Sequence, residues 1–115
     1  ARDIHNSRIP NVTAKRLTQE DFEFKSIFIN GEEIISQHKR LAIPKNIVDR
    51  DEVYVIRRIY INGEERDAAR LVCPQIGTEN EEFYEVTGGI DRRDIVIYES
   101  NKKLKDGDEV YITNK

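Results

Sequence analysis

The most restrictive feature of this sequence is the kind of apolar residue that it uses. It contains 16 Ile and 8 Val, against 4 Leu, 5 Ala and no Met. β-Branched side chains pack well on a pleated surface and lose rotamer freedom in a helix. Ile, Val, Leu and Phe together make up 32 of the 115 residues, which is above the level of about 20% where disorder becomes the expectation. The sequence therefore predicts a folded chain that is mostly β.

Turn signals recur along the chain at a spacing that suits short strands. The segment Ile-Asn-Gly-Glu-Glu occurs twice, at 29–33 and 61–65, and Asn-Gly is the strongest short-range signal for a two-residue hairpin. We interpret the identity as two hairpins with the same favoured turn, not as a repeat. An all-β fold follows: a small antiparallel barrel or sandwich of about eight to nine strands with little helix. The main expected strands are 22–29, 34–35, 41–43, 53–61, 68–73, 83–87, 95–98 and 109–113.

The two ends of this pattern carry further expectations. Residues 1–20 are polar and are predicted to be a linker or a trimmed end, with weak support for a short helix around Leu17. The strand 22–29 is expected to be buried on both faces near its end. Residues 95–98 are apolar on both faces, so this strand should lie centrally in its sheet. Cys73 cannot form an internal disulfide, because it is the single cysteine. It precedes Pro74 at a predicted strand end, and we predict a small buried filler and not a reactive thiol, which would need an electropositive and partly open setting.

Composition excludes several classes of protein. The net charge of −3 argues against a nucleic-acid-binding domain, which would normally carry a basic surplus. No run approaches the ~20 apolar residues of a membrane-spanning helix, and the first residues have no apolar core of a signal peptide. One Cys and two His make a closed zinc site of the usual type improbable. We expect no metal and no cofactor.

The pattern of polar residues indicates turns and not a catalytic or metal-binding site. The carboxylates cluster beside Gly or Asn, at 32–33, 64–65 and 79–82, where they are solvated and solubilising. Residues 106–108 read Asp-Gly-Asp, but the further oxygen ligands of a calcium loop do not follow. His5 and His38 have no Ser or Cys partner in a recognisable local frame. We therefore predict no catalytic residues and no enzymatic activity.

Between residues 41 and 113 the apolar runs and turns follow a distinctive order. An apolar strand leads into Pro44 and Lys45, and a second apolar pair comes next. A charged turn then precedes a Val-Tyr-Val-Ile strand. A segment with two adjacent glycines and a closing Leu-Lys-Asp-Gly-Asp-Glu-Val follow further on. In order, these pieces occupy 41–48, 53–56, 71–77, 84–90, 93–97 and 104–110.

This order resembles the membrane fusion proteins, the bacterial periplasmic adaptors of tripartite efflux pumps and related secretion systems. One position departs from the pattern, because Arg93 stands where that family usually has Gly. The resemblance implies that residues 21–48 are part of a β-barrel and that residues 49–115 form a membrane-proximal β domain. It also implies that a coiled-coil hairpin and a lipoyl-like domain precede this chain, which lacks an initiator Met and would be a processed or excised piece.

The function implied by the resemblance is associative. Such an adaptor bridges an inner-membrane transporter to an outer-membrane channel, assembles as a ring, and lies in the periplasm or outside the cytoplasm, membrane-associated in its full-length form. Its membrane-proximal domain docks on the transporter, and surface charges would set the register of that contact. On that basis the candidate partner-binding residues are Arg57, Arg58, Arg92 and Arg93.

Two other interpretations stay open at this point. One is a β-grasp module like the small sulfur-carrier and ubiquitin-like proteins, suggested by 28–33 and 104–110. Those carriers act through a C-terminal Gly-Gly, whereas this chain ends in Asn-Lys. The other is a generic β interaction domain of a larger protein, such as a carbohydrate-binding domain or part of a larger enzyme. An exposed aromatic platform would favour it, but the chain has no Trp.

Overall fold

In the computed structural model of this chain, residues 8–114 are described, without the side chains of residues 26–29. His5 and the expected burial near the end of the strand 22–29 therefore lie outside what is described. The regular elements within that range are β1 (Asn11–Arg16), β2 (Thr18–Ile29), β3 (Glu32–Pro44), the 3-10 helix η1 (Lys45–Ile47), β4 (Val53–Ile61), β5 (Glu64–Val72), β6 (Gln75–Glu79), β7 (Phe83–Gly88), β8 (Ile95–Ser100) and β9 (Tyr111–Ile112).

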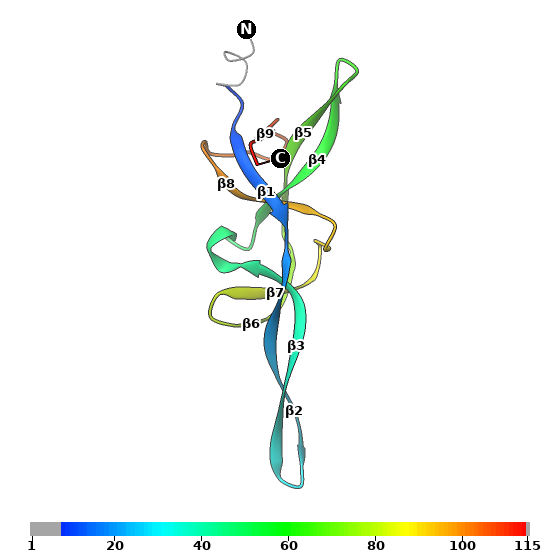
Figure 1. Cartoon of the computed structure of the whole chain (residues 1–115), viewed down its shortest axis with the longest axis vertical. Helices are drawn as coiled ribbons and strands as arrows, with labels where there is room; N and C mark the ends of the chain where they lie inside the picture. The colour runs from blue at the N-terminus through cyan, green and yellow to red at the C-terminus, as the bar shows by residue number, and fades with distance from the viewer. Residues whose placement is uncertain (1–7, 115) are drawn as a thin grey trace.

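The strands form two sheets, which confirms the prediction of an all-β fold. One sheet has five strands in the order β5-β4-β8-β1-β9, and the other has four in the order β2-β3-β7-β6. Neither sheet closes into a barrel over the described residues. Strands from the predicted segments 21–48 and 49–115 share the four-stranded sheet, because β7 pairs with the end of β3. Figure 1 shows the two sheets following one another along the long axis.

The middle of the five-stranded sheet agrees with the sequence pattern. β8 lies at its centre, between β4 and β1, as the apolar residues on both of its faces predict. One pairing departs from the antiparallel expectation, because β9 runs parallel to β1. β9 is two residues long, and it reaches β1 only after the chain has looped over the sheet.

The prediction that residues 1–20 form a linker is wrong for the part described as strands. β1 pairs with β8 and β9, and β2 begins at Thr18. β1 is short and buries only two small or medium side chains, Val12 and Ala14. Its partners lie at least 79 residues away in the chain, so no local turn signal marks it. Leu17, expected in a helix, is instead a buried residue that separates β1 from β2 in the sequence.

The two Asn-Gly turns are confirmed as hairpins. Asn30 and Gly31 have φ of 55° and 79°, and Asn62 and Gly63 have φ of 51° and 81°, as a type I′ turn requires. Both turns join strands in register, β2 to β3 and β4 to β5. The expected separate pieces 34–35 and 41–43 are one strand, β3. The polar residues between them belong to a part of β3 whose side chains are nearly all exposed, so no hydrophobic alternation is needed there, while Phe22 on the paired β2 is 1% exposed.

Two hydrophobic clusters hold the fold together. The first lies between the sheets and joins β3 and β7 to β4 and β8; its buried members are Leu17, Ile43, Val53, Val55, Val86, Ile90 and Val96. The second covers the other face of the five-stranded sheet under the segment 104–110; its buried members are Val12, Ala14, Ala69, Ile97 and Val110. The five-stranded sheet is thus covered on both faces, which explains the continuous apolar runs of β4 and β8.

One buried carboxylate joins the strands of the four-stranded sheet at the end that lies next to the five-stranded sheet. Glu85 on β7 is 7% exposed. Its Oε1 accepts a hydrogen bond from the Thr78 backbone amide of β6 at 3.0 Å, and its Oε2 lies 3.4 Å from Arg40 Nε of β3. A side chain at Gly77 would collide with this carboxylate. Glu85 therefore links three strands, and a side chain at position 77 would force this carboxylate to move.

Cys73 is exposed, which contradicts the prediction of a buried filler. β5 ends at Val72 and β6 begins at Gln75, so Cys73 lies in the crossover from one sheet to the other. Its neighbour Pro74 is buried instead, against Gly89, whose φ is +84° and which leaves no room for a side chain beside Pro74.

The molecule is a rod. Its extents are 71 × 24 × 24 Å and its radius of gyration is 18.0 Å, whereas a compact domain of this length would have about 13 Å. The β2–β3 hairpin forms one end of the rod, and the β4–β5 hairpin projects at the other (Figure 1). From about residue 40 toward the Asn30-Gly31 turn, neither hydrophobic cluster extends under the β2–β3 ribbon.

Candidate partner-binding surface

Two elements carry the four arginines that the resemblance suggests as contacts. Arg57 and Arg58 are consecutive on β4, so they point to opposite faces of the five-stranded sheet. Arg92 and Arg93 are both exposed and lie in the turn before β8. The structure therefore distributes the predicted residues over two faces, and only some of them can share a surface.

The turn at 91–94 is built around two aspartates. Asp91 Oδ1 accepts a hydrogen bond from the backbone amide of Arg93 at 2.7 Å, and Asp94 Oδ2 accepts one from the amide of Asp91 at 3.0 Å. These side-chain caps close the turn without a glycine, and Arg93 does not adopt a positive φ. The departure from the family pattern at Arg93 is thus accommodated by the Asp caps.

Arg57 fastens this turn to β4. Its Nη1 lies 3.2 Å from Asp94 Oδ1, the oxygen that does not cap the turn, and it also donates to the Ile56 carbonyl at 3.2 Å. Arg57 is half exposed at 45%, and Asp94 is more buried at 21%. The structure thus brings Arg57 to the turn that presents Arg92 and Arg93. We call Arg57, Arg92, Arg93 and Asp94 the arginine turn.

Arg58 belongs to a separate network on the other face. Its guanidinium contacts Glu65 Oε2 at 2.6 Å and Asp67 Oδ1 at 3.4 Å, and Tyr60 donates to Glu65 Oε1 at 3.1 Å. The hydrogen bond from Arg58, reinforced by that from Tyr60, lowers the pKa of Glu65 below its ordinary value. The same contact raises the pKa of Arg58. Arg58 therefore stabilises its own hairpin.

No protein-family model, curated protein or solved structure significantly matches this chain.

Sequence reasoning missed the apolar side chains that the two hairpins expose. Tyr60 is 69% exposed and Ile61 40%, next to the β4–β5 turn. Ile34 is 39% exposed and Ile35 53%, next to the β2–β3 turn. The signal was present, since each pair lies within four residues of an Asn-Gly turn, where little of a domain core can reach. These residues place apolar surface at both ends of the rod.

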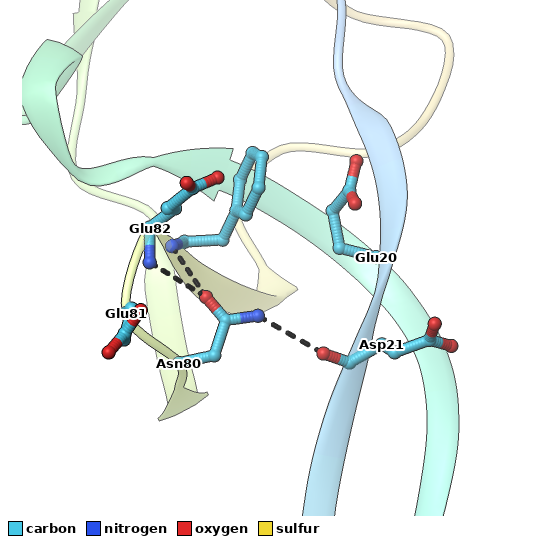
Figure 2. Close-up of a pocket in the computed structure, with 6 residues that line it drawn as sticks. Glu20, Asp21, Asn80, Glu81 and Glu82 are labelled. Carbon is cyan, nitrogen blue, oxygen red and sulfur yellow. Dashed lines mark hydrogen bonds between the residues drawn. The ribbon is translucent and has the colours of Figure 1, made fainter.

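An open hollow of about 350 Å³ lies where the β6–β7 turn meets β2. Figure 2 shows Asn80 pointing across it toward Asp21. The Asn80 Nδ2 donates to the Asp21 carbonyl at 3.1 Å, and its Oδ1 accepts from the amides of Glu82 and Phe83 at 3.0 and 2.8 Å. The hollow is thus a seam between two hairpins. Glu20 and Glu81 also line the hollow. The carboxylates around the hollow are solvated, as the sequence predicts for 79–82.

The remaining candidate groups of the sequence are also engaged locally. Asp106 Oδ1 accepts from the amide of Leu71 at 2.9 Å and Asp108 Oδ2 from that of Lys105 at 2.8 Å, which confirms a turn at Asp-Gly-Asp. His38 is exposed, with Nε2 3.1 Å from Ser36 Oγ.

Among the described side chains, no three or more His, Cys, Asp or Glu are grouped to hold a metal ion. Nor does that part of the chain include a helix of membrane-spanning length and apolarity.

Proposed function

We propose that this chain is part of a non-catalytic adaptor, a membrane fusion protein of a bacterial efflux or secretion complex. The observation that supports it most is the rod shape, with exposed apolar side chains on projecting hairpins at both ends. A binding protein that bridges others needs extended surface, whereas small-molecule sites are usually concave and enclosed. The order of motifs over residues 41–113 supports the family.

The partners follow from the same resemblance. The adaptor would dock on an inner-membrane transporter outside the cytoplasm and connect it to an outer-membrane channel, with ring assembly in the full-length protein. The arginine turn is our candidate contact with the transporter. Arg92 and Arg93 would meet acidic groups of the partner, and Arg57 would hold the turn in position. Arg58, engaged with Glu65 and Asp67, would contribute less.

The carboxylates observed here support a structural use and not a catalytic one. Asp91, Asp94, Asp106 and Asp108 each accept hydrogen bonds from backbone amides in turns. A carboxylate that caps a turn is occupied by the amide, and moving it would open the turn. We therefore propose that the chain is not an enzyme.

The two alternatives differ in what supports them. A β-grasp fold packs a helix across its sheet, whereas the helix among the described residues is the three-residue η1. A generic β interaction domain would have the same exposed hairpins. Its specific support is Tyr60, an aromatic side chain that is 69% exposed, so we keep it as the second candidate.

Photo-cross-linking in the native cells tests the proposed docking. A photoreactive amino acid replaces Arg92 or Arg93 in the gene of the complete protein, and adducts are identified by mass spectrometry. We expect an adduct with a polytopic membrane transporter from both positions. As a matched control, the same amino acid at Arg70, another exposed arginine, should give none.

A charge reversal extends this test to function. With the photoreactive amino acid at position 92 or 93, Glu at the other of these two positions should abolish the transporter adduct, and the double variant Arg92→Glu/Arg93→Glu should reduce efflux or secretion, while Arg70→Glu should do neither. Adducts with soluble proteins alone would favour the generic interaction domain. Adducts with a transporter that are insensitive to both reversals would move the docking site away from the arginine turn.

A further inference from the structure

One strand of the projecting hairpin is an edge strand along most of its length. β3 pairs with β2 along its whole length from Glu32 to Ala42. On its other side, among the described strands, it has a partner only from Ala42 to Pro44, where β7 lies. An edge strand of this kind offers backbone donors and acceptors to another strand. From Glu32 to Arg40 all its side chains except Ser36 are exposed.

The charges along this edge are arranged symmetrically. Residues 32–40 read Glu-Glu-Ile-Ile-Ser-Gln-His-Lys-Arg, with two acidic residues at one end and two basic residues at the other. In an antiparallel pair centred on Ser36, residue i lies opposite residue 72 − i. Glu32 then faces Arg40 and Glu33 faces Lys39, and the two-fold axis repeats both pairs at the other end. Opposite charges directly across two strands stabilise the pair, and like charges destabilise it.

The same register also gives an exposed apolar side chain a neighbour that can cover it. Ile35 lies opposite Gln37, so the alkyl part of the glutamine can cover an isoleucine that is 53% exposed in one copy. Paired residues have the same parity, so each pair lies on one face of the combined sheet. A two-fold contact needs such self-complementarity, because the same patch is used by both copies.

We propose that two copies of this chain pair through β3, antiparallel and centred on Ser36, to form a four-stranded sheet from two β2–β3 hairpins. Nine residues of β3 would pair, over about 30 Å. The contact gives the ribbon the neighbouring strands that it lacks within one molecule, since an isolated two-stranded ribbon is marginally stable in water. This two-fold contact goes beyond the proposed docking role, which concerns the other sheet.

The opposite edge of the hairpin fits a second copy less well. β2 carries Glu20, Asp21 and Glu23 against a single basic residue, Lys25, in the same stretch. Two such strands would leave carboxylates without a cation opposite. In addition, the Asp21 carbonyl already accepts a hydrogen bond from Asn80. The charge pattern therefore favours β3 as the paired edge, where Lys39 and Arg40 also contact Asp21 and Glu85 of their own chain.

Cysteine cross-linking tests the register. In a Cys73→Ser background, Ser36→Cys places two thiols opposite each other on the two-fold axis. Directly opposed residues of antiparallel strands have Cα atoms about 4.5–5.5 Å apart, within the range of a disulfide. We expect rapid formation of a covalent dimer at micromolar concentration. Glu33→Cys is the matched control on the same strand: it should not link to itself, because its two copies would lie about 20 Å apart.

Charge reversal tests the pairing with uncross-linked protein. Glu33→Lys and Lys39→Glu each place like charges opposite each other at both ends, and sedimentation should show the dimer dissociation constant raised roughly tenfold or more. Mixing the two variants restores both opposite-charge pairs, so a heterodimer should form. Glu99→Lys, the same change at an exposed site on β8, should leave the dissociation constant unchanged.

The results separate this proposal from its alternatives. A chain that stays monomeric at concentrations up to the millimolar range, with no Ser36→Cys dimer, would overturn the two-fold contact. Two results would overturn the register: a Glu33→Cys variant that forms the disulfide-linked dimer as readily as Ser36→Cys, or a dimer dissociation constant that neither Glu33→Lys nor Lys39→Glu changes. Arg92→Glu/Arg93→Glu should leave the dimer intact, so loss of transporter docking and loss of dimerisation are distinguishable.

Discussion

Single side chains in this molecule act mainly as partners for backbone amides. Asn80 and Asp94 each use an oxygen to cap a turn and a second atom to contact a neighbouring element, and Asp91 caps the same turn as Asp94. Polar side chains that are short and close to the backbone suit this use, because they form turn-closing hydrogen bonds at little entropic cost. Individual residues thus fasten the loops to the sheets.

Replacing Asn80 tests this use at the seam between the hairpins. Asn80→Ala removes three hydrogen bonds and leaves two amides of the β6–β7 turn without their acceptor, so the free energy of unfolding should fall by about 1–2 kcal/mol. Urea denaturation at 25 °C measures the change. Asn46→Ala, at an exposed site on η1, is the control. Equal midpoints for the two variants would contradict the role of Asn80.

A pH titration tests the Arg58 network. Because the hydrogen bond from Arg58 lowers the pKa of Glu65 in the folded chain, the ionised carboxylate stabilises the native state above the unfolded pKa. That contribution is lost as the pH falls through the lowered folded pKa. Arg58→Gln should return the Glu65 titration midpoint, followed by the NMR shift of its carboxyl carbon, toward the ordinary value. Arg70→Gln should not move it, and an unmoved midpoint in Arg58→Gln would refute the assignment.

The hairpins and turns show how local sequence determines each element. Asn30-Gly31 and Asn62-Gly63 occupy type I′ turns that need a positive φ at both central residues. The turn between η1 and β4 has the same backbone, since Arg50 and Asp51 have φ of 54° and 65°. Asp49 and Glu52 close it with two backbone hydrogen bonds of 3.0 and 2.9 Å. Here the tertiary structure imposes a conformation that the local residues disfavour.

This strained turn predicts a stabilising substitution. Arg50→Asn/Asp51→Gly converts it to the sequence of the other two turns and should raise the free energy of unfolding by about 1 kcal/mol. The reciprocal change, Gly63→Ala, should lower it by about the same amount, because Gly63 has φ of +81° with no heavy atom near enough to clash. Thermal unfolding followed by circular dichroism measures both. Shifts of the same sign would mean that φ is not the cause.

The whole molecule divides into a packed body and an unsupported ribbon. The five-stranded sheet is covered on both faces by the two hydrophobic clusters. In the distal part of β2–β3, the β3 side chains from Glu32 to Arg40 are exposed except Ser36, and the described ribbon there consists of two strands alone. Such a ribbon should open locally without unfolding the body. In the proposed dimer, the second copy would add the missing strands.

Hydrogen exchange tests this division. In dilute solution, amides of residues 23–25 and 33–37 should have protection factors at least about a hundredfold lower than those of β8, because two-stranded hairpins are marginally stable while the core opens only on global unfolding. Raising the protein concentration should protect the β3 amides and leave β8 unchanged if the dimer forms. Equal protection of ribbon and core in dilute solution would contradict the division.

The features that the sequence alone determined are those set by neighbouring residues. The preference of β-branched residues for strands, the two Asn-Gly turns and the central place of β8 follow from local sterics and periodicity. They were sufficient to predict an all-β fold with about the observed number of strands. The Asp-Gly-Asp turn was predictable for the same reason.

The tertiary structure decided what depends on contacts between distant segments. β1 became a strand only through β8 and β9, whose paired residues lie at least 79 positions away. β3 kept its polar half as a strand because β2 pairs with it. Cys73 was exposed by the crossover between the sheets. Arg57 joined Asp94 across 37 residues, while Arg58 beside it faced another network. Periodicity shows which way a side chain alternates, but only packing determines which distant group it meets.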